Sequence, residues 1–314
     1  MPTDLARAVE TVIHRCLAVQ PGEEVVVVGD ASTADIAAAL RDEAERAGAD
    51  ATLTVATARA TDGEEPSRAV AAALAAADVF VAPTAWSISH TRARKAASDA
   101  GARGATMPHV TADMLARLMA ADFDLMGQRS RAVADLLTSA SEARITCPHG
   151  TDLTLDLTGR EAIPDDGDLT ARGAFGNLPC GEGFISPVGG RGTLYASSLA
   201  AIGLADPPAR LTLEDGRLAT AEGPPGEQLL ARLVAAGDQG TNLAELGVGT
   251  NERAGLTGNI LEDEKMLGSV HVAFGASAGI GGTVSVPVHL DVLVLDATLT
   301  LDGTKVLDAG RFAL

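Results

Sequence analysis

Short, continuous apolar runs alternate with alanine-rich amphipathic runs through the first half of the chain. The run EEVVVVGD at residues 23–30 has no polar alternation, which is typical of a strand buried on both faces of a parallel sheet. A helical pattern follows at residues 32–49, with Ser32 or Thr33 as its cap and Gly48 at its end. The same rhythm continues, with strands expected at 50–57 and 78–84 and helices expected at 65–77 and 91–104. This order predicts a doubly wound α/β domain built on a parallel sheet.

The pattern changes near residue 138, where apolar and polar positions begin to alternate. Alternation at residues 142–160 and 209–223 predicts half-exposed antiparallel strands. A helix is expected at 225–240, and an Asp-Gly turn at residues 302–303 is expected to join two of the last strands. The sequence therefore predicts an α/β domain at residues 1–138, followed by an α+β domain at residues 139–314.

Composition and charge narrow the class of protein. With 46% hydrophobic and 21% charged residues, the 314-residue chain has an ordinary globular composition. Its formal net charge of −18 argues against nucleic acid or an anionic membrane surface as a partner, because both require a basic footprint. The N-terminus is charged and amphipathic, unlike a signal peptide, and the three cysteines form no paired motif. We therefore expect a cytoplasmic location.

Polar residues interrupt two valine-rich stretches near the C-terminus. His271 lies in SVHVAFG, and His289 and Asp291 lie in VPVHLDV. Residues two apart on a strand point to the same face, so His289 and Asp291 project together, and His271 can join them if the two strands are neighbours. Two imidazoles and one carboxylate suit Zn²⁺ or Co²⁺, or Fe²⁺ when coordination positions stay open. Unrelated polar residues on edge strands are the simpler alternative.

Further carboxylates stand near glycine-rich turns. Glu182 lies in NLPCGEGFISP and Glu245 in NLAELGVGTNE, and each alone is most simply a solvated charge. If both fold over the histidines and the aspartate, the set suffices for two divalent ions with a bridging water. An acidic run follows at Glu262, Asp263 and Glu264, and its simplest interpretation is a solvated turn. Alternatively, one of the three carboxylates orients a ligand histidine or acts as a general base.

Other kinds of chemistry have weaker support in the sequence. The turn VVVVGDAST lacks the GxGxxG spacing of a dinucleotide site, and the glycine-rich segment at residues 275–282 joins two strands instead of opening a helix. The GxSxG spacing at residues 275–279 (GASAG) lies in that same strand-joining segment, so it does not form the strand-to-helix elbow that Ser-His-Asp catalysis uses. A metal site is therefore the leading candidate.

Five segments resemble, in the same order, those of the thermophilic metallo-aminopeptidases of the aminopeptidase T and aminopeptidase S type. They are HGTDLTLDLTGR, GNLPCGEGFISPVGG, LAELGVGTN, NILEDEKMLGSVHVAFG and VHLDVLV. The resemblance implies a homodimer and a pair of divalent metal ions (Zn, Co or Mn) held by Glu182, Glu245, His271, His289 and Asp291. The chain departs from that family at Ala278, where the aminopeptidases carry a tyrosine, and in its shorter C-terminal half.

A second branch of the same fold, the 2,5-dihydroxypyridine dioxygenases, also looks similar. Similarity to that branch implies a single Fe(II) held by His271, His289 and Asp291, and cleavage of an aromatic ring. Because a hydrolase needs Glu182 and Glu245 to secure a second metal, the presence of both glutamates favours the hydrolase.

The main interpretation from sequence is therefore a dinuclear, metal-dependent, aminopeptidase-like hydrolase. A metal-activated water would cleave an amide or peptide bond in a small molecule or short peptide, with Glu245 or Glu264 as the proton-transfer residue. The alternatives are the Fe(II) dioxygenase and a non-catalytic protein that binds a metal or a small molecule on the same scaffold.

Overall fold

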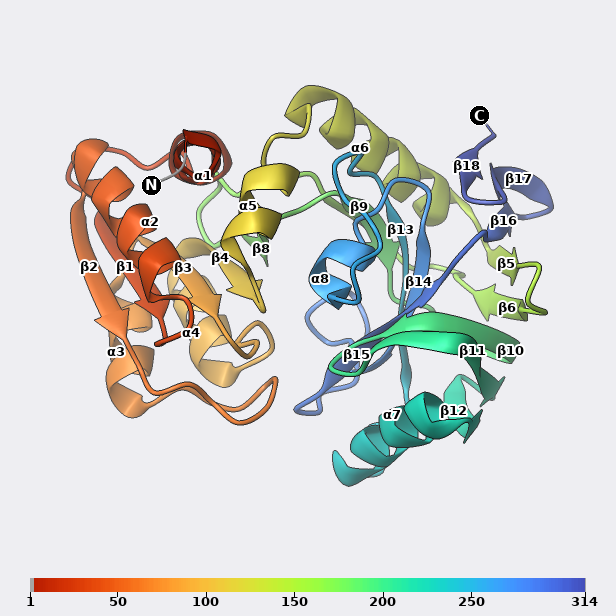
Figure 1. Cartoon of the computed structure of the whole chain (residues 1–314). Helices are drawn as coiled ribbons and strands as arrows, with labels where there is room; N and C mark the ends of the chain where they lie inside the picture. Colours follow the sequence, from red (N-terminus) through yellow and green to blue (C-terminus); the bar gives the residue numbers. More distant parts are fainter. Residues whose placement is uncertain (1–2, 314) are drawn as a thin grey trace. The chain divides into compact units, whose positions relative to one another are not determined.

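The computed structural model describes residues 3–313, which form two compact units (Figure 1). Unit 1 is Met1–Asp122 together with Gly167–Cys180, and unit 2 is Phe123–Asp166 together with Gly181–Leu314. Residues 1, 2 and 314, which the predicted domain bounds include, lie outside the described residues. Within residues 3–313, no helix is both long and apolar enough to cross a membrane.

Unit 1 is a parallel sheet with helices in its crossovers. Its elements are α1 (Thr3–Glu10), the π-helix η1 (Thr11–Cys16), β1 (Glu24–Gly29), α2 (Ala34–Arg46), β2 (Asp50–Val55), α3 (Arg68–Ala76), β3 (Val79–Thr84), α4 (Arg92–Ala100), β4 (Arg103–Pro108), α5 (Ala112–Leu118) and β8 (Phe175–Asn177). The strands run parallel in the order β2-β1-β3-β4-β8. Five of the six residues of β1 are buried, as the continuous apolar run predicts. The predicted α/β fold of this part is confirmed.

Side-chain caps explain where several helices of unit 1 begin. The hydroxyls of Ser67, Thr91 and Thr111 each accept a hydrogen bond from the backbone N–H three residues later, at the starts of α3, α4 and α5. Thr33 precedes α2 as predicted, but its hydroxyl donates instead to the carbonyl of Pro83 on β3. That bond ties the first turn of α2 to the sheet.

Unit 2 is built on one large, mainly antiparallel sheet. Its elements are α6 (Phe123–Ser139), β5 (Glu142–Thr146), β6 (Asp152–Asp156), β7 (Ile163–Asp165), β9 (Glu182–Ile185), β10 (Gly189–Leu199), β11 (Gly203–Glu214), β12 (Arg217–Glu222), α7 (Pro224–Ala235), β13 (Leu243–Gly249), α8 (Ile260–Asp263), β14 (Val270–Gly275), β15 (His289–Val294), β16 (Thr298–Leu301), β17 (Thr304–Asp308) and β18 (Arg311–Phe312). The strand order is β18-β17-β16-β5-β6-β10-β15-β14-β13-β9-β7, and β11 and β12 extend from β10. This confirms the predicted α+β character, and the Asp302-Gly303 turn joins β16 to β17 as expected.

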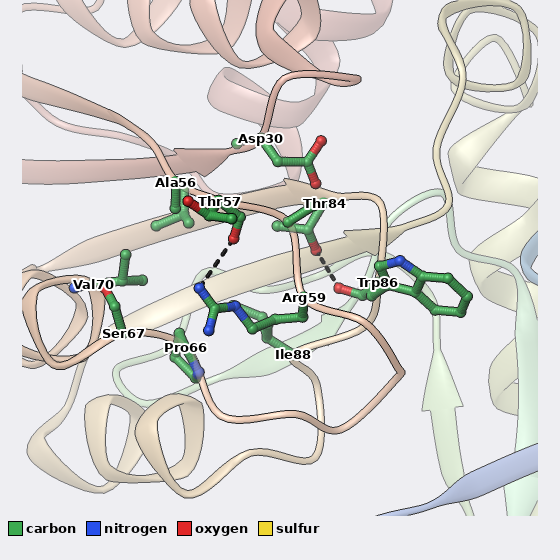
Figure 2. Close-up of a pocket in the computed structure, with 13 residues that line it drawn as sticks. Asp30, Ala56, Thr57, Arg59, Pro66, Ser67, Val70, Thr84, Trp86 and Ile88 are labelled. Atoms are coloured by element: carbon green, nitrogen blue, oxygen red, sulfur yellow. Dashed lines mark hydrogen bonds between the residues drawn. The ribbon is translucent and has the colours of Figure 1, made fainter.

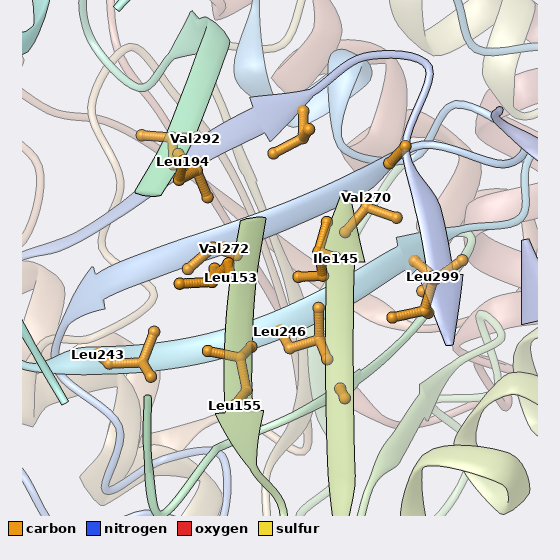
Figure 3. Packing of buried hydrophobic residues seen from close by; sticks show 14 of the residues in the cluster. Ile145, Leu153, Leu155, Leu194, Leu243, Leu246, Val270, Val272, Val292 and Leu299 are labelled. Carbon is orange, nitrogen blue, oxygen red and sulfur yellow. The ribbon is translucent and has the colours of Figure 1, made fainter. Parts of the chain in front are cut away.

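The core of unit 2 lies where the sheet curls over itself. Leu246 of β13, Val272 of β14 and Val292 of β15 belong to one buried cluster with Leu153 and Leu155 of β6. Figure 3 shows these side chains between β13 and β14 and the strands β5 and β6, which cross them. One face of β13, β14 and β15 is thereby filled with apolar side chains, which leaves the other face for polar ones.

The observed units differ from the predicted boundary at residues 138 and 139. α6 belongs to unit 2, because it packs against β7 and β9, where the lack of a side chain at Gly183 gives room for Val133. Residues 167–180 return to unit 1, because β8 pairs with β4. An amphipathic helix and a three-residue strand do not reveal which sheet they pack on, so periodicity alone could not place them.

Candidate metal centre

Four consecutive strands of unit 2 bring the predicted site residues to one face of the sheet. Glu182 begins β9, Glu245 lies on β13, His271 lies on β14, and His289 and Asp291 lie on β15. These strands are neighbours in the order β15-β14-β13-β9, inside the sheet, and His271 is fully buried. The alternative of unrelated polar residues on edge strands therefore does not hold for this chain.

Each of these side chains lies opposite a small residue on a neighbouring strand. The pairs are Glu182 with Gly249, His271 with Gly247, His289 with Gly275, and Ala273 with both Glu245 and Asp291. A Cβ placed on Gly247 would lie 2.1 Å from Nε2 of His271, so the imidazole lies directly over the glycine backbone. The small residues make the space in which the polar side chains meet.

The carboxylate of Glu245 lies between the two imidazoles. Nε2 of His271 is 3.2 Å from Oε1 of Glu245, and Nε2 of His289 is 3.2 Å from Oε2. Oε2 of Glu182 lies 3.2 Å from Nε2 of His271, and Oδ1 of Asp291 lies 3.6 Å from Nε2 of His289. The five residues thus form two overlapping groups that could each hold a cation, Glu182–Glu245–His271 and Glu245–His289–Asp291. The strands bring together the full set that the sequence analysis named, and Glu245 is shared.

The ring orientation of His289 is fixed by the backbone. Its Nδ1 donates a hydrogen bond of 2.7 Å to the carbonyl of Ala276. Because a carbonyl can only accept, Nδ1 keeps its hydrogen, and Nε2 is the atom that can lose a proton and bind a metal. A backbone carbonyl on the far ring nitrogen is the usual support of a metal-binding histidine.

The carboxylates make both imidazoles basic in the metal-free chain. Burial by itself would lower the pKa of His271, but the Glu182 carboxylate and the hydrogen bond with Glu245 outweigh it and raise the pKa to about 9. Burial is likewise outweighed at His289, whose pKa is raised by Asp291 and Glu245. Conversely, burial would raise the pKa of Glu245, yet its hydrogen bonds with the two histidines hold that pKa well below its usual range. The site therefore holds protons that a metal ion would displace.

Lys265 adds a cation beside this cluster that the sequence analysis did not single out. Its side chain is 1% exposed, and Nζ lies 2.5 Å from Oε1 of Glu182 and 2.7 Å from Oε1 of Glu264. Oδ2 of Asp165 is 3.8 Å away. Burial raises the pKa of Glu264 and of Asp165 to about 8 in each case, although Lys265 opposes the shift. The one sequence signal was a lysine directly after three acidic residues, in a chain with few lysines.

The acidic run before Lys265 is buried, so the solvated-turn interpretation of it is wrong. Glu262, Asp263 and Glu264 are between 0% and 6% exposed. Asp263 accepts hydrogen bonds from the backbone N–H of Gly258 and from the hydroxyl of Ser198, and Glu262 accepts one from the N–H of Gly255. These two carboxylates hold the preceding loop in place, while Glu264 faces the lysine.

The donor atoms present fit a divalent transition metal. Imidazole nitrogens and carboxylate oxygens are the ligands that Fe²⁺, Mn²⁺, Co²⁺ and Zn²⁺ accept in proteins. Oε2 of Glu182 is buried and makes no hydrogen bond with the described residues, and it lies 3.2 Å from Nε2 of His271, so both atoms could bind the same ion. The residues of unit 2 can therefore hold a metal.

Unit 1 has a separate hollow at the carboxyl ends of β1 and β3 (Figure 2). The side chain of Arg59 crosses it and donates a hydrogen bond to the carbonyl of Thr57. The Asp30 carboxylate accepts hydrogen bonds from the N–H groups of Ser32 and Ala85. These two donors are thus used within the chain, and the groups of three or more metal-binding side chains found among the described residues lie in unit 2.

Two solved structures share the fold of this chain. A 2,5-dihydroxypyridine dioxygenase from Pseudomonas putida KT2440 superimposes with a TM-score of 0.82 at 20% identity, covering 98% of this chain and 96% of the other. Wild-type AmpT from Thermus thermophilus superimposes with a TM-score of 0.72 at 20% identity, covering 99% of each chain. At this identity both comparisons establish the fold, and the relation to the aminopeptidase T type is a likeness of fold. A comparison with curated proteins gave no match.

The sequence model of a family distinguishes between the two branches. The model described as NicX, 2,5-dihydroxypyridine 5,6-dioxygenase, matches residues 4–314. It agrees with the dioxygenase alternative of the sequence analysis better than with the main interpretation as an aminopeptidase-like hydrolase. Because the match spans nearly the whole sequence, the chain belongs to the 2,5-dihydroxypyridine 5,6-dioxygenase family.

Proposed function

We propose that this protein is a mononuclear, Fe(II)-dependent dioxygenase that opens a hydroxylated aromatic ring of the dihydroxypyridine type. The observation that carries the proposal is the match of the dioxygenase family model to residues 4–314. The buried cluster supports it, because it offers two imidazoles and an aspartate on adjacent strands. The fold shared with a solved 2,5-dihydroxypyridine dioxygenase is consistent with this assignment.

In this proposal, His271, His289 and Asp291 hold the iron. Two imidazoles and one carboxylate are the donor set of non-haem Fe(II) oxygenases, and they leave positions open for O₂ and substrate. The bound ferrous ion supplies the one-electron chemistry that reaction with O₂ requires. The chain contributes rigidity, because the Ala276 carbonyl fixes the ring of His289 and the bare backbone of Gly247 lets the ring of His271 lie flat against β13.

A hydroxylated ring that binds as an anion would have to give up a proton, and a carboxylate of the chain would be the natural acceptor. Glu245 is the better placed of the two proposed proton-transfer residues, because its oxygens lie between the two imidazoles. A metal ion that displaces the histidine protons would also remove the hydrogen bonds that hold the pKa of Glu245 low in the metal-free chain. Glu264 is the second candidate, but its carboxylate is held 2.7 Å from Nζ of Lys265. Substitution of Glu245 by glutamine is therefore expected to slow ring opening more than substitution of Glu264.

The test is oxygen uptake by protein loaded anaerobically with Fe(II), with 2,5-dihydroxypyridine as substrate. We expect one O₂ consumed per ring opened, followed by the loss of the ring's ultraviolet absorbance. His289→Ala and Asp291→Ala should lose both iron and oxygen uptake, whereas His149→Ala, at an exposed histidine, should retain both.

The competing candidate is the dinuclear hydrolase, which is favoured by the two cation-binding groups that share Glu245. It predicts two Zn, Co or Mn ions per chain and release of the amino-terminal residue from peptides. Peptide hydrolysis with two ions per chain, together with no oxygen uptake on any dihydroxypyridine, would overturn the dioxygenase proposal.

A further inference from the structure

The buried ammonium of Lys265 raises the question of how many metal ions the site can hold. Nζ contacts one oxygen of Glu182 at 2.5 Å, and the other oxygen of the same carboxylate faces His271 at 3.2 Å. The Glu182–Glu245–His271 group therefore already has a positive charge beside it. Lys265 is 1% exposed, so little water screens that charge.

We infer that Lys265 takes the place of a second metal ion and thereby limits the site to one. A divalent cation in the Glu182–Glu245–His271 group would lie next to the ammonium, and the two positive charges would repel each other in a buried environment. The Glu245–His289–Asp291 group contains two of the three proposed iron ligands and lies on the other side of Glu245 from Lys265's partner Glu182, so it remains available. Without a second ion to bind, His271 is free to serve as the third ligand of the one that is held there. This inference rests on the proposed mononuclear function and adds the residue that determines the metal count.

The anionic surroundings of Lys265 support a role as a substitute for a metal ion. Glu182, Glu264 and Asp165 all direct an oxygen at Nζ, and all three side chains are at most 9% exposed. Oδ2 of Asp165 makes no hydrogen bond with the described residues, so the ion pair with Lys265 is its compensation. Removing the ammonium would leave the buried Glu182 carboxylate without its cationic partner, and the group to which Glu182 belongs offers the ligands for a metal ion in its place.

The experiment counts bound Mn²⁺ by mass spectrometry and records its electron paramagnetic resonance spectrum, so it does not depend on activity. We expect one ion in the unmodified protein and two in Lys265→Met, with the second producing a spin-coupled spectrum because the two groups share Glu245. Lys265→Arg retains the charge and should bind one ion. Lys305→Met is the matched control at a half-exposed lysine and should also bind one.

A second variant protects the test against misfolding. Lys265→Met combined with Glu264→Gln removes the ammonium together with the titratable carboxyl group that contacts it and leaves the Glu182–Glu245–His271 group intact, so it too should take up two ions. A single ion in folded Lys265→Met and in the double variant would overturn the inference while leaving the proposed function standing. Two ions in the unmodified protein would overturn both. Failure of both variants to fold at saturating Mn²⁺ would also overturn it, because the ion could then not replace the ammonium.

Discussion

Gly247→Ala should disable the metal site through a single methyl group. The added Cβ would lie 2.1 Å from Nε2 and 2.2 Å from Cε1 of His271, whereas ordinary contact begins at 3.4 Å. The imidazole must therefore retreat by about 1.3 Å, if the backbone of β13 holds its place. A metal–nitrogen bond is about 2.0–2.1 Å long and tolerates deviations of roughly 0.2 Å, so the displaced ring cannot remain a ligand.

The expected magnitudes follow from the contacts of the ring. Losing the correct placement of one histidine should weaken metal binding by at least 10–100-fold, which corresponds to about 1.4–2.8 kcal/mol. Because His271 is fully buried, the forced shift should also cost about 1–3 kcal/mol of folding stability. For a domain of about 150–250 residues, each kcal/mol lowers Tm by roughly 2–4 °C.

The assay is anaerobic calorimetric titration with Fe²⁺, together with thermal unfolding in the presence of a chelator. Gly189→Ala is the matched control, because a Cβ at that strand glycine meets nothing within 4 Å. The decisive comparison is Gly247→Ala in a His271→Ala background, where the methyl group has no imidazole to displace and should change neither metal affinity nor Tm further. Metal affinity in Gly247→Ala equal to that of Gly189→Ala would show that the glycine does not position the ring.

Three further predictions concern protons and buried carboxylates. The pKa values of His271 and His289 are raised, that of His271 to about 9, so metal binding at pH 7 should release about two protons. The release would appear as a calorimetric heat of metal binding that depends on the ionisation enthalpy of the buffer. A heat that is the same in all buffers would contradict this prediction. The hydrogen bonds with Arg103 hold the pKa of Glu23 below its usual 4.5, so this pair stabilises the fold above that pH, and its contribution is lost as the pH falls through the lowered pKa. In Glu23→Gln, the free energy of unfolding in urea should therefore change less between pH 3 and pH 6. An unchanged dependence of that free energy on pH would refute the assignment. Asp263→Ala should cost about 2–3 kcal/mol in urea unfolding, because it leaves the buried hydroxyl of Ser198 and the part-buried N–H groups of Thr257 and Gly258 without their acceptor. A cost under about 1 kcal/mol would show that the loop does not depend on this carboxylate.

Local sequence patterns were sufficient to predict most elements of the fold, but not their grouping. Continuous apolar runs and period-two alternation depend on burial of one face or of both, so β1 and the β5–β6 pair were predictable from their own residues. The assignment of α6 to unit 2 and the return of residues 167–180 to unit 1 depend on contacts with distant strands. No local pattern encodes those contacts.

The candidate site was likewise only partly predictable from the sequence. The spacing of His289 and Asp291 predicts that both point to one face, and the pairing of β14 with β15 brings His271 to that face. The burial of Glu264 and Lys265 could not be read from the sequence, because an acidic run followed by a lysine has the composition of a solvated turn. Their burial results from α8 and from Asp263, which anchors the preceding loop from within.

The small residues opposite the site are a more specific signal than the ligands themselves. Histidines and carboxylates are common, but on β13 and β14 the site-facing positions next to Glu245 and His271 are small residues, Gly247, Ala273 and Gly275. The intervening positions, such as Leu246 and Val272, fill the core. A strand that alternates small residues with large apolar ones therefore packs the core with one face and leaves space on the other face for a binding site.

The inventory of ligands alone does not determine the chemistry. All five residues that the aminopeptidase resemblance implies as ligands for two metals are present and adjacent, yet the family model that matches the chain is that of a dioxygenase. In this chain a buried cation lies beside them, because Nζ of Lys265 contacts one oxygen of Glu182. On the inference drawn above, a neutral residue at position 265 would leave the same five ligands open to two cations, and a cation there leaves room for one. The proposed choice of one ion for reaction with O₂ over two ions for activating water would then be set by a residue that binds no metal.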